Sequence, residues 1–529
     1  MHWFDELYPS VEASVAEKDP VVCNAGISVS GLQHVGSLRG EIVLNHFIAA
    51  RLRSAERTVT QHLVLYTQDP WKGTPEQLAQ FAADEGTPYT GYRMIEVPDP
   101  EGCHANWVDH YWEGFAGPMD RFAPGVEVSR TTDLYRTEAM QSLVHEVADQ
   151  AEALRELVNQ FRPRNPLPKG WIPFEPLCLT CRRIGDARAL GFRNGEVEYE
   201  CACGGKGLSA LELGKLNWRI EWPVLWALLG VSVEPFGKDH AAPGGSRETS
   251  RVIAETILNI QPPFGIPYEW VGYAEDGTDQ GDMSSSRFTG FGPTAWLSVA
   301  DPEVLRFLFA ATPIRRRLVL DLSRVDAYHQ RYDQAESGYY EGSEEDANRA
   351  YRLAQLESFP QETPFQLGYR HASLLAQVAP ADDPLAWALA RLTATGMAEG
   401  ALSSWERDRI ERRLVQARSW AHDLAPVEYR VEVQESLPPG VDAALSGPER
   451  NSLNRLRDAL AKVAWEEEAI KEAMVDLTSQ EDLGVPTSGF FAALYRTFLD
   501  KPSGPRAAPL LAVLDRDFVL ERLAQAGGE

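Results

Sequence analysis

Four cysteines in the middle of the chain have a spacing that suits a metal ion. Cys178 and Cys181 are separated by two residues, and Cys201 and Cys203 follow after 19 intervening residues. Two close pairs of thiolates match the tetrahedral coordination of Zn²⁺, and the metal would hold together a small hairpin that lacks a core of its own. Because the protein would supply all four ligands, the pattern predicts a structural zinc. The C-x-C spacing of the second pair, where C-x-x-C is commoner, leaves open whether Cys203 reaches the metal.

A second region that could carry chemistry runs from Val21 to Arg53. Apolar residues at 21–27 predict a buried strand, and apolar residues at helical spacing between 42 and 52 predict a helix. The glycine-containing turn between them carries His34 and Gly36. Backbone N–H groups and the positive end of the helix dipole meet at such a turn, so it suits a phosphate.

The elements that would position this turn follow the pattern of a parallel sheet. Residues 59–69 predict a second strand, completing a strand–helix–strand unit that binds ligands at the carboxyl ends of its strands. We expect the sheet pattern to return at 216–230. Residues 231–236 predict a further strand and 237–245 a polar loop, and Ser246 is expected to be the N-cap of a helix that ends at Leu258.

Length and composition indicate a multidomain protein. The 529 residues suffice for two to four domains, and six cysteines in so long a chain do not predict a disulfide framework. No stretch of 18 apolar residues and no secretion signal is present, so we expect a cytoplasmic protein without membrane contact. The net charge of −26 counts against nucleic-acid binding. Local arginine-rich faces at 315–317 and 407–418 could still bind it, or could be solvated helix faces.

Several motifs resemble one family of enzymes. SGLQHVGS at 30–37 resembles the SGxxHxGN/H signature of the class I aminoacyl-tRNA synthetases, and DMSSS at 282–286 resembles their KMSKS loop. Three further segments resemble the class I lysyl-tRNA synthetases specifically: VPDPEGCHANWVDHY at 97–111, WRIEWP at 218–223 and EPFGKDHAAPGGS at 234–246. These blocks follow the family order along nearly the whole chain. The chain is therefore identified as a member of this family. Within the first of the three segments, Cys103 and His104 are interpreted as a capped turn with a buried thiol and not as metal ligands.

The resemblance implies an ATP site built from both signature motifs, with Mg²⁺ at the phosphates. ATP would be held in line for attack by the lysine carboxylate, and the protein would mainly position the reactants and stabilise charge. The implied catalytic residues are His34, Gly36, Ser37, Ser284, Ser285, Ser286 and Arg287. Met283 is implied as a further ATP contact, and His240, Gly244 and Gly245 would line the ribose and adenine side.

A lysine side chain needs a carboxylate and an aromatic face for its ammonium group. Trp218 and Glu221 have these types, although Trp218 could equally be a core residue. A carboxylate amid apolar neighbours, like that of Glu221, needs a partner if it is buried. The implied lysine-binding residues are Gly26, Ser28, Trp218, Glu221, His240 and Tyr268, with Gly26 and Ser28 at the α-amino group.

Three positions depart from the family pattern. Asp282 stands where the signature loop usually has lysine, which reverses a charge expected near the pyrophosphate. Arg287 could supply that cation. Ser37 replaces the usual histidine or asparagine, and Val29 replaces a proline. The sequence leaves open whether Asp282 weakens activation.

The predicted fold class is α/β: a Rossmann-like parallel-sheet catalytic domain with a zinc-containing insertion, followed by an all-α C-terminal domain. Residues 1–70 and 215–320 would form the two halves of the catalytic domain. Residues 71–214 would form the insertion, with a long helix at 137–161 and the zinc module near 172–208. Residues 321–529 would form a helical anticodon-binding domain with one doubtful strand at 429–433.

The function implied by the resemblance is ATP-dependent ligation of L-lysine to tRNA(Lys). Lysine and ATP would form lysyl-adenylate with release of pyrophosphate, and the terminal ribose of tRNA would then displace AMP. We expect a monomer. Two alternatives remain: a paralogue that activates lysine or an analogue for a non-tRNA acceptor, and a catalytically inactive relative that binds tRNA or lysine.

Overall fold

The computed structural model describes residues 1–343, 345–356, 360–380, 382–398 and 400–528. The chain forms two compact units. The first contains Met1–Trp296, Leu305–Leu320 and Glu344–Glu357, and the second contains Leu297–Val304, Asp321–Ser343 and Ser358–Glu529. The first unit therefore includes a short segment from the region predicted to be the C-terminal domain.

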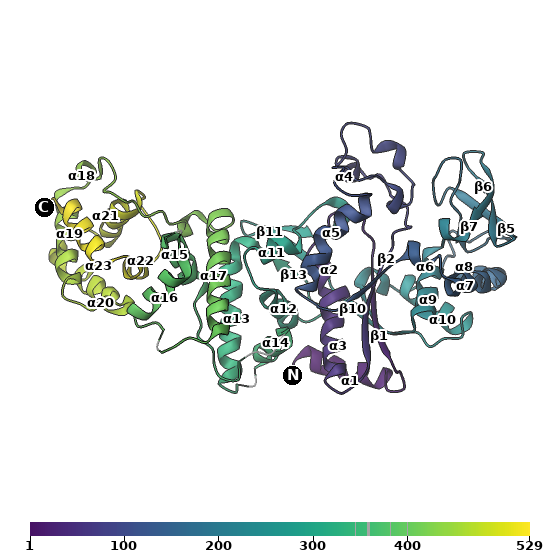
Figure 1. Ribbon diagram of the computed structural model, residues 1–529, viewed down its shortest axis with the longest axis horizontal. Helices are drawn as coiled ribbons and strands as arrows, with labels where there is room; N and C mark the ends of the chain where they lie inside the picture. The colour runs from purple at the N-terminus through teal and green to yellow at the C-terminus, as the bar shows by residue number, and fades with distance from the viewer. Residues whose placement is uncertain (344, 357–359, 381, 399, 529) are drawn as a thin grey trace. The chain divides into compact units, whose positions relative to one another are not determined.

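A parallel sheet organises the first unit (Figure 1). Its strands are β1 (Val21–Ile27), β2 (Val59–Leu65), β3 (Glu127–Arg130), β9 (Val231–Gly237) and β10 (Phe264–Tyr268), in the order β10-β9-β1-β2-β3. All four neighbouring pairs are parallel. Numbered along the chain, this is the 3-2-1-4-5 order of a Rossmann-like fold, which places its ligand crevice at the carboxyl ends of the strands beside the central one. The predicted α/β class is confirmed.

The helix after β1 starts with a distorted turn. It consists of α2 (Gly36–Leu38), a π-helical turn (Arg39–Leu44) and α3 (Asn45–Arg53). A Cβ atom on Gly40 would collide with the ring of Tyr268, so the turn approaches β10 as closely as only glycine allows. Such π-turns often occur at functional sites.

The segment predicted to return to the sheet is a helix instead. Only Lys215–Leu216 form a short strand (β8), and α9 spans Trp218–Leu229. The helix is buried along most of its length, so its apolar run has no polar face that would reveal a helical period. Gly230, in the left-handed conformation at φ 63°, ends it. The next helix, α10 (Ser246–Thr256), has Gly245 rather than Ser246 at its N-cap.

The region between β2 and β8 differs from prediction in two ways. It contributes β3 to the parallel sheet, a strand too short and too exposed to predict from its pattern. The helix predicted at 137–161 is two helices that meet at Gln150. The helices are α4 (Pro75–Leu78), α5 (Trp107–Asp120), α6 (Thr131–Leu134), α7 (Glu138–Asp149) and α8 (Ala151–Gln160).

Three small sheets complete the described part of the first unit. β5 (Ala187–Arg193), β6 (Glu196–Cys201) and β7 (Lys206–Ala210) form an antiparallel meander, and β4 (Phe174–Glu175) pairs with β8. β11 (Val271–Glu275) and β12 (Thr278–Asp282) form a hairpin, and β13 (Leu318–Leu320) lies parallel to β11. The β12 strand leads directly into the serine-rich loop.

The remaining helices include α1 (Trp3–Ser14) and α14 (Asp346–Ala354) in the first unit, and the consecutive helices α11 (Pro293–Leu297) and α12 (Pro302–Ala311). The described part of the second unit is helical, as predicted. The doubtful strand at 429–433 is wrong: a 3₁₀ turn at Val427–Tyr429 runs into irregular chain. The helices are α13 (Val325–Tyr340), α15 (Tyr369–Val378), α16 (Pro384–Ala394), α17 (Ser404–Asp423), α18 (Val441–Ala444), α19 (Gly447–Leu460), α20 (Glu467–Thr478), α21 (Thr487–Leu499), α22 (Ala507–Val513) and α23 (Arg516–Gly527).

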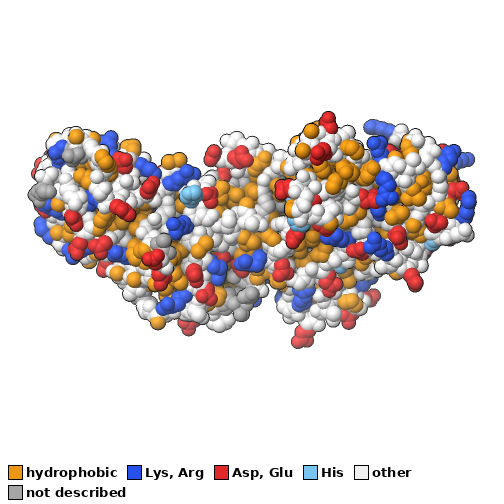
Figure 2. Space-filling model, turned by 45° about the horizontal axis from the view of Figure 1, so that its top comes forward, with side chains coloured by type: hydrophobic (Ala, Val, Ile, Leu, Met, Phe, Trp, Pro, Cys, Tyr) orange, Lys and Arg blue, Asp and Glu red, His pale blue; other side chains and the backbone are white. Residues whose placement is uncertain are grey.

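Basic and acidic side chains are interspersed on the surface shown in Figure 2. The charge of −26 is therefore not concentrated in one region of that face. Among the described residues, no helix combines the length and apolar character needed to cross a membrane.

Candidate active site

A cavity of about 350 Å³ lies at the carboxyl ends of β1 and β10. It brings together eleven of the residues singled out in the sequence, which come from both signature motifs and from the two strand ends. They are Gly26, Ser28, His34, Gly36, Ser37, Tyr268, Met283, Ser284, Ser285, Ser286 and Arg287. Its lining also includes Glu41, Trp270 and Asp282. The position is the one that the strand order predicts for a ligand.

The first signature loop holds a neutral histidine against the helix start. Burial lowers the pKa of His34 to about 4, so the imidazole is uncharged near pH 7. Its Nδ1 atom has no hydrogen-bond partner in the described part of the chain. A Cβ atom on Gly36 would lie 2.8 Å from that nitrogen. The loop thus presents an imidazole and backbone N–H groups to the cavity, which suits a phosphate or ribose oxygen.

The serine-rich loop packs directly against the first signature. A Cβ atom on Gly31 would collide with the carbonyl oxygen of Ser285 and would lie 2.8 Å from Phe288. Ser284 and Thr289 exchange two backbone hydrogen bonds of 3.1 Å, which close the loop at its base. Arg287, within that loop, is the only arginine or lysine among the residues that line the cavity. The arrangement supplies hydroxyl groups and one cation to the cavity that His34 also lines.

Asp282 does not leave an uncompensated negative charge beside this loop. Its carboxylate accepts a hydrogen bond of 2.6 Å from Nε of Arg317, just before β13. The two Nη groups of Arg317 donate to Asp279, at 2.5 and 3.0 Å. A Cβ atom on Gly272 would collide with this guanidinium. Arg317 therefore ties both ends of β12, the strand that carries the loop, to the neighbouring strands.

In the ATP-dependent activation that the sequence resemblance implies, we expect Arg317→Ala to slow the reaction about tenfold, because a hydrogen bond to a charged group contributes about 1.5–3 kcal/mol. The loss should fall on kcat and on the KM for ATP, with the KM for lysine unchanged, in pyrophosphate exchange assays. Arg317→Lys should recover only part of the activity, since lysine lacks the fork that bridges two carboxylates. Arg316→Ala, at an exposed neighbour, is the matched control. Equal losses in Arg317→Ala and Arg316→Ala would contradict this role.

Glu41 is the functional candidate that the sequence analysis missed. It lies in the π-helical turn and lines the cavity. Tyr268 donates a hydrogen bond to its Oε1 atom, whereas its Oε2 atom has no hydrogen-bond partner among the residues described. Burial raises the pKa of Glu41 to about 7. A carboxylate with a free oxygen facing a cavity can bind a cation such as a lysine ammonium group. A lone glutamate among apolar helix residues was the available signal.

Glu221 lies elsewhere, in a buried ionic network. Its Oε2 atom is 2.9 Å from Nζ of Lys215, and its Oε1 atom accepts a 2.8 Å hydrogen bond from Tyr135. Lys215 also pairs with Asp69. Although burial opposes its charge, these two carboxylates hold the pKa of Lys215 above its usual value. Lys215 therefore already pairs with the carboxylate of Glu221. Glu221 is also not among the residues that line the cavity.

The other four predicted site residues also lie outside the cavity lining. Trp218 packs between Tyr66 and Trp222, with ring centroids 5.4 and 5.2 Å away. Tyr66 in turn contacts Gly26, where a Cβ atom would collide with its ring. Trp218 is thus linked to the cavity through Tyr66.

The loop after β9 also lies outside the lining of the cavity. The ring centroids of His240 and Trp218 lie 5.8 Å apart. The Nδ1 atom of His240 is 2.7 Å from Oγ of Ser246. Gly244 and Gly245 belong to the same loop, where Gly244 donates to Glu248 and Gly245 caps α10. This loop lies at the carboxyl end of the strand next to β1, so a ligand larger than the cavity could reach it.

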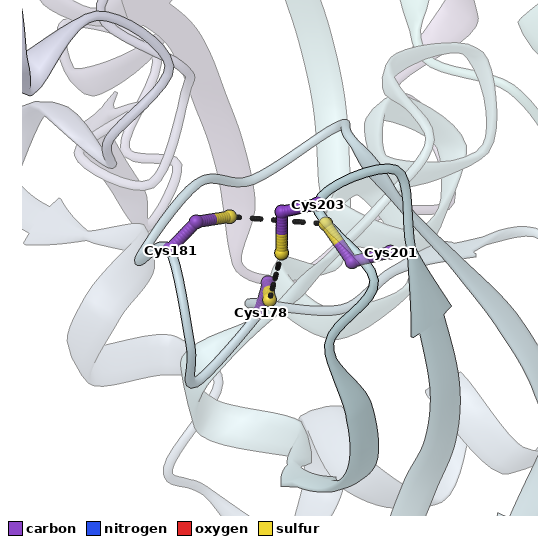
Figure 3. Close-up of side chains that lie close together, drawn as sticks. All are labelled: Cys178, Cys181, Cys201 and Cys203. Carbon is purple, nitrogen blue, oxygen red and sulfur yellow. Dashed lines mark hydrogen bonds between the residues drawn. The ribbon is translucent and has the colours of Figure 1, made fainter.

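The four predicted metal-binding cysteines converge (Figure 3). Their sulfur atoms all lie within 4.8 Å of one another. The pairs Cys178–Cys203 and Cys181–Cys201 are both 3.7 Å apart, and all four thiols are free. Tetrahedral zinc with Zn–S bonds of about 2.3 Å separates its sulfur ligands by about 3.8 Å. The observed spacing fits that ion, and Cys203 lies close enough to serve as a ligand.

A second cluster of metal-binding side chains lies near the start of α5. Asp99, Cys103, His104 and His110 offer ligand atoms within 4.8 Å of one another. Cys103 Sγ is 2.9 and 3.3 Å from the Nδ1 atoms of His104 and His110, and His110 Nδ1 is 3.0 Å from Asp99. A thiolate, two imidazoles and a carboxylate are all ligands that Zn²⁺ accepts. The interpretation of Cys103 as a buried thiol in a capped turn is wrong, because the Cys103 side chain is exposed and lies beside both histidines. It also overlooked His110, one helical turn into α5.

The chain is similar to known proteins over its whole length. Residues 1–358 match the family described as tRNA synthetases class I (K). A lysine–tRNA ligase from Aeropyrum pernix is 39% identical over 99% of this chain and 98% of the relative. Lysine–tRNA ligases from Methanosphaera stadtmanae and Pyrococcus horikoshii are 28% and 27% identical, over 98% and 100% of both chains respectively. Together with the cavity that joins the two signature loops, these matches show that the chain belongs to the class I (K) tRNA synthetases.

Proposed function

We propose that this protein is a lysine–tRNA ligase that first forms lysyl-adenylate from lysine and ATP. The terminal ribose of tRNA then attacks the activated carbonyl and releases AMP. The single observation that carries the choice of lysine is the free Oε2 atom of Glu41 in a cavity that also contains both nucleotide-binding signatures. The names of the relatives agree with this substrate.

In this proposal the cavity holds the ATP phosphates together with the carboxylate and the two amino groups of lysine. His34, the N–H group of Gly36 and the side chain of Ser37 bind ATP. Ser284, Ser285 and Ser286 donate hydrogen bonds to its phosphates, and Arg287 neutralises part of their charge. Glu41 binds the lysine ammonium, and Tyr268 holds Glu41 in place. Gly26 and Ser28, at the end of β1, face the α-amino end of the substrate. The protein thus supplies positioning and charge stabilisation, which are the main requirements of phosphoryl-group chemistry.

Two kinds of metal belong to the proposal. Mg²⁺ would neutralise the ATP phosphates, as it does in most enzymes that use ATP. Zn²⁺ would bind the cysteine cluster in a structural role, because four thiolates leave no open position for a substrate. The cluster of Asp99, Cys103, His104 and His110 is a second candidate metal site.

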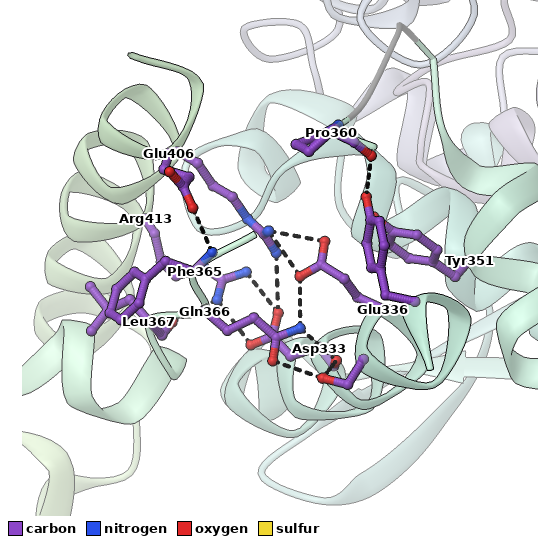
Figure 4. Close-up of polar contacts among 12 residues, drawn as sticks. Asp333, Glu336, Tyr351, Pro360, Phe365, Gln366, Leu367, Glu406 and Arg413 are labelled. Atoms are coloured by element: carbon purple, nitrogen blue, oxygen red, sulfur yellow. Dashed lines mark hydrogen bonds and ion pairs between the residues drawn. The ribbon is translucent and has the colours of Figure 1, made fainter. Parts of the chain in front are cut away.

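The second unit is proposed to bind the anticodon region of tRNA. Two arginines of the run at 407–418 are unavailable for that contact, because they lie in a buried ionic network (Figure 4). Arg409 donates to both oxygens of Glu336 at 2.9 Å, and Arg413 donates to both oxygens of Asp333 at 2.9 Å. This network fastens α17 to α13. Exposed arginines of the same helix, such as Arg407 and Arg418, remain candidates.

Pyrophosphate exchange and tRNA charging test this function. We expect lysine, and not arginine or ornithine, to support exchange of pyrophosphate into ATP in the presence of tRNA, and radioactive lysine to be transferred to tRNA. Exchange without transfer to any tRNA would indicate the paralogue with another acceptor. No exchange with any amino acid would indicate a binding protein. The expected cytoplasmic location and monomeric state remain predictions.

A further inference from the structure

The π-helical turn that carries Glu41 breaks the regular hydrogen-bond pattern of its helix. In an α-helix the main-chain N–H group of Asn45 would donate to the carbonyl oxygen of Glu41, four residues earlier. Here it donates to the carbonyl oxygen of Ile42 instead. A π-turn contains more residues than an α-helical turn, so it changes the direction in which its side chains leave the helix. The turn therefore decides where the carboxylate of Glu41 lies.

Two side-chain amides bind the carbonyl groups of this turn. Nδ2 of Asn45 donates to the carbonyl oxygen of Glu41 at 3.1 Å. Nε2 of Gln61, in β2, donates to the carbonyl oxygen of Ile42 at 2.8 Å. Both amides are buried. A buried carbonyl group needs a donor, and a side chain that enters the main-chain hydrogen-bond ladder distorts a helix. The two amides therefore stabilise the π-helical form relative to a regular helix.

Asn45 also joins the turn to the neighbouring strand. The same Nδ2 atom donates to the carbonyl oxygen of Asn24, in β1, at 2.9 Å. One buried amide group thus uses both of its hydrogens, one toward the turn and one toward the strand. Gly26 and Ser28, at the end of that strand, line the cavity. Asn45 therefore fixes the turn relative to the strand end that faces the substrate.

The opposite side of the turn is held by β10. Arg39 is buried and donates to the carbonyl oxygen of Glu269, the residue after this strand, at 3.0 Å. Gly40 packs against the ring of Tyr268, whose hydroxyl group donates to Glu41. Contacts from β1, β2 and β10 therefore surround the turn. A turn held from three strands keeps one orientation, which a binding site for a single ammonium group requires.

The side-chain oxygen of Asn45 indicates that this amide is not optimised for stability. Oδ1 is buried and has no hydrogen-bond partner in the described part of the chain, which is a cost to the folded state. Leucine has a similar volume, leaves no unpaired polar atom and favours a regular helix, in which the main chain would satisfy the carbonyl group of Glu41. Helix stability by itself thus favours an apolar residue here, and a role in placing Glu41 accounts for the amide.

We propose that Asn45 is a positioning residue for lysine binding: it keeps the turn in its π-helical form and thereby directs the free carboxylate oxygen of Glu41 into the cavity. The proposal rests on the proposed function, since it takes Glu41 to bind the lysine ammonium group. Asn45 is not among the residues that line the cavity, so it acts only through Glu41. Gln61 supports the same turn from β2.

A comparison of lysine with norleucine tests this role. Norleucine has the four-carbon side chain of lysine without the ammonium group, so its affinity does not depend on where Glu41 lies. We expect Asn45→Leu to raise the dissociation constant for lysine about tenfold, measured by calorimetric titration. The inhibition constant of norleucine in lysine-dependent pyrophosphate exchange and the KM for ATP should stay at their wild-type values. A general distortion of the cavity would weaken the binding of all three ligands.

A double-mutant cycle separates this role from an independent effect on the fold. In a Glu41→Gln background the charge that Asn45 positions is gone, so Asn45→Leu should change lysine affinity less than about twofold. Gln61→Met, which removes the other amide, should give the same pattern with a smaller loss. It provides the test if Asn45→Leu does not fold.

Gln68→Met is the matched control for these variants. Gln68 follows β2, is fully buried, donates to the carbonyl oxygen of Glu212 at 2.7 Å and has an unpaired side-chain oxygen among the described residues. Its replacement should lower the melting temperature without changing lysine affinity.

Three results would overturn the role of Asn45. They are equal weakening of lysine and norleucine, the full tenfold loss in the Glu41→Gln background, and wild-type affinity for lysine in both Asn45→Leu and Gln61→Met. In each of these cases the wild-type protein still binds lysine, so the proposed function stands. A wild-type protein that does not bind lysine at all would contradict the proposed function and this role together.

Discussion

Glu41→Gln should raise the dissociation constant for lysine about 100-fold and reduce lysine-dependent pyrophosphate exchange to a similar extent. Truncating one partner of a buried charge pair costs about 2–5 kcal/mol, and about 3 kcal/mol corresponds to this factor. Glutamine keeps the shape of the side chain and can still accept from Tyr268, so the loss reports the charge at Oε2. Calorimetric titration with lysine measures the dissociation constant. The affinity for ATP should be unchanged.

The same carboxyl group predicts how lysine binding depends on pH. Burial raises the pKa of Glu41 to about 7, whereas its partner Tyr268 has a pKa well above the usual value and stays protonated. Only the ionised carboxylate attracts an ammonium group. As pH falls below 7, protonation of Glu41 competes with binding, and the dissociation constant should rise about tenfold per pH unit. Above pH 7 it should level off, and Glu41→Gln should abolish the dependence.

Glu221→Gln is the matched comparison, since both variants neutralise a buried glutamate. It weakens the pairing of Lys215, which then keeps only Asp69 as a close carboxylate partner. We expect a lower melting temperature and a change in lysine affinity of less than about threefold, because an unbalanced buried charge is mainly a cost in stability. If Glu221→Gln instead raised the lysine dissociation constant as much as Glu41→Gln, the assignment of Glu41 would be wrong.

Loss of a thiol from the cysteine cluster should unfold the meander of β5, β6 and β7 locally. A structural zinc contributes about 10–16 kcal/mol in isolated fingers, which exceeds what a hairpin of this size can gain from its core. Cys203→Ser is the informative change, because the C-x-C spacing left this ligand in question. We expect it to release as much zinc as Cys178→Ser, measured by elemental analysis, and to raise amide hydrogen exchange across 187–210 at least about 100-fold.

Cys23→Ser provides the control for this experiment. Cys23 is a buried thiol in β1, outside both candidate metal-binding clusters, so its replacement removes a sulfur atom without removing a proposed ligand. Zinc content should therefore stay at the wild-type value. Retention of zinc and of exchange protection in Cys203→Ser would mean that three cysteines suffice for the site.

Local patterns predicted much of the framework. The strand at 21–27, its glycine turn and the following helix are correct. The strands predicted at 59–69 and 231–236 are observed as β2 and β9, because each is encoded by neighbouring residues. Two other elements could not be predicted from local patterns. The α9 helix is apolar on nearly all sides, so its period could not be read, and β3 is a partly exposed strand of four residues.

The sequence by itself determined the two signature loops, the two cysteine pairs and the family, since these depend on residue types at short spacing. The structure added that Cys203 converges with the other three cysteines. Only the tertiary structure decided which carboxylate faces the substrate cavity. Glu41 and Glu221 are both glutamates in apolar surroundings, but Tyr268 leaves one oxygen of Glu41 free, whereas Lys215 and Tyr135 occupy Glu221. Pairing between residues far apart in the chain determines the charge that a site offers, and local sequence cannot specify such pairing.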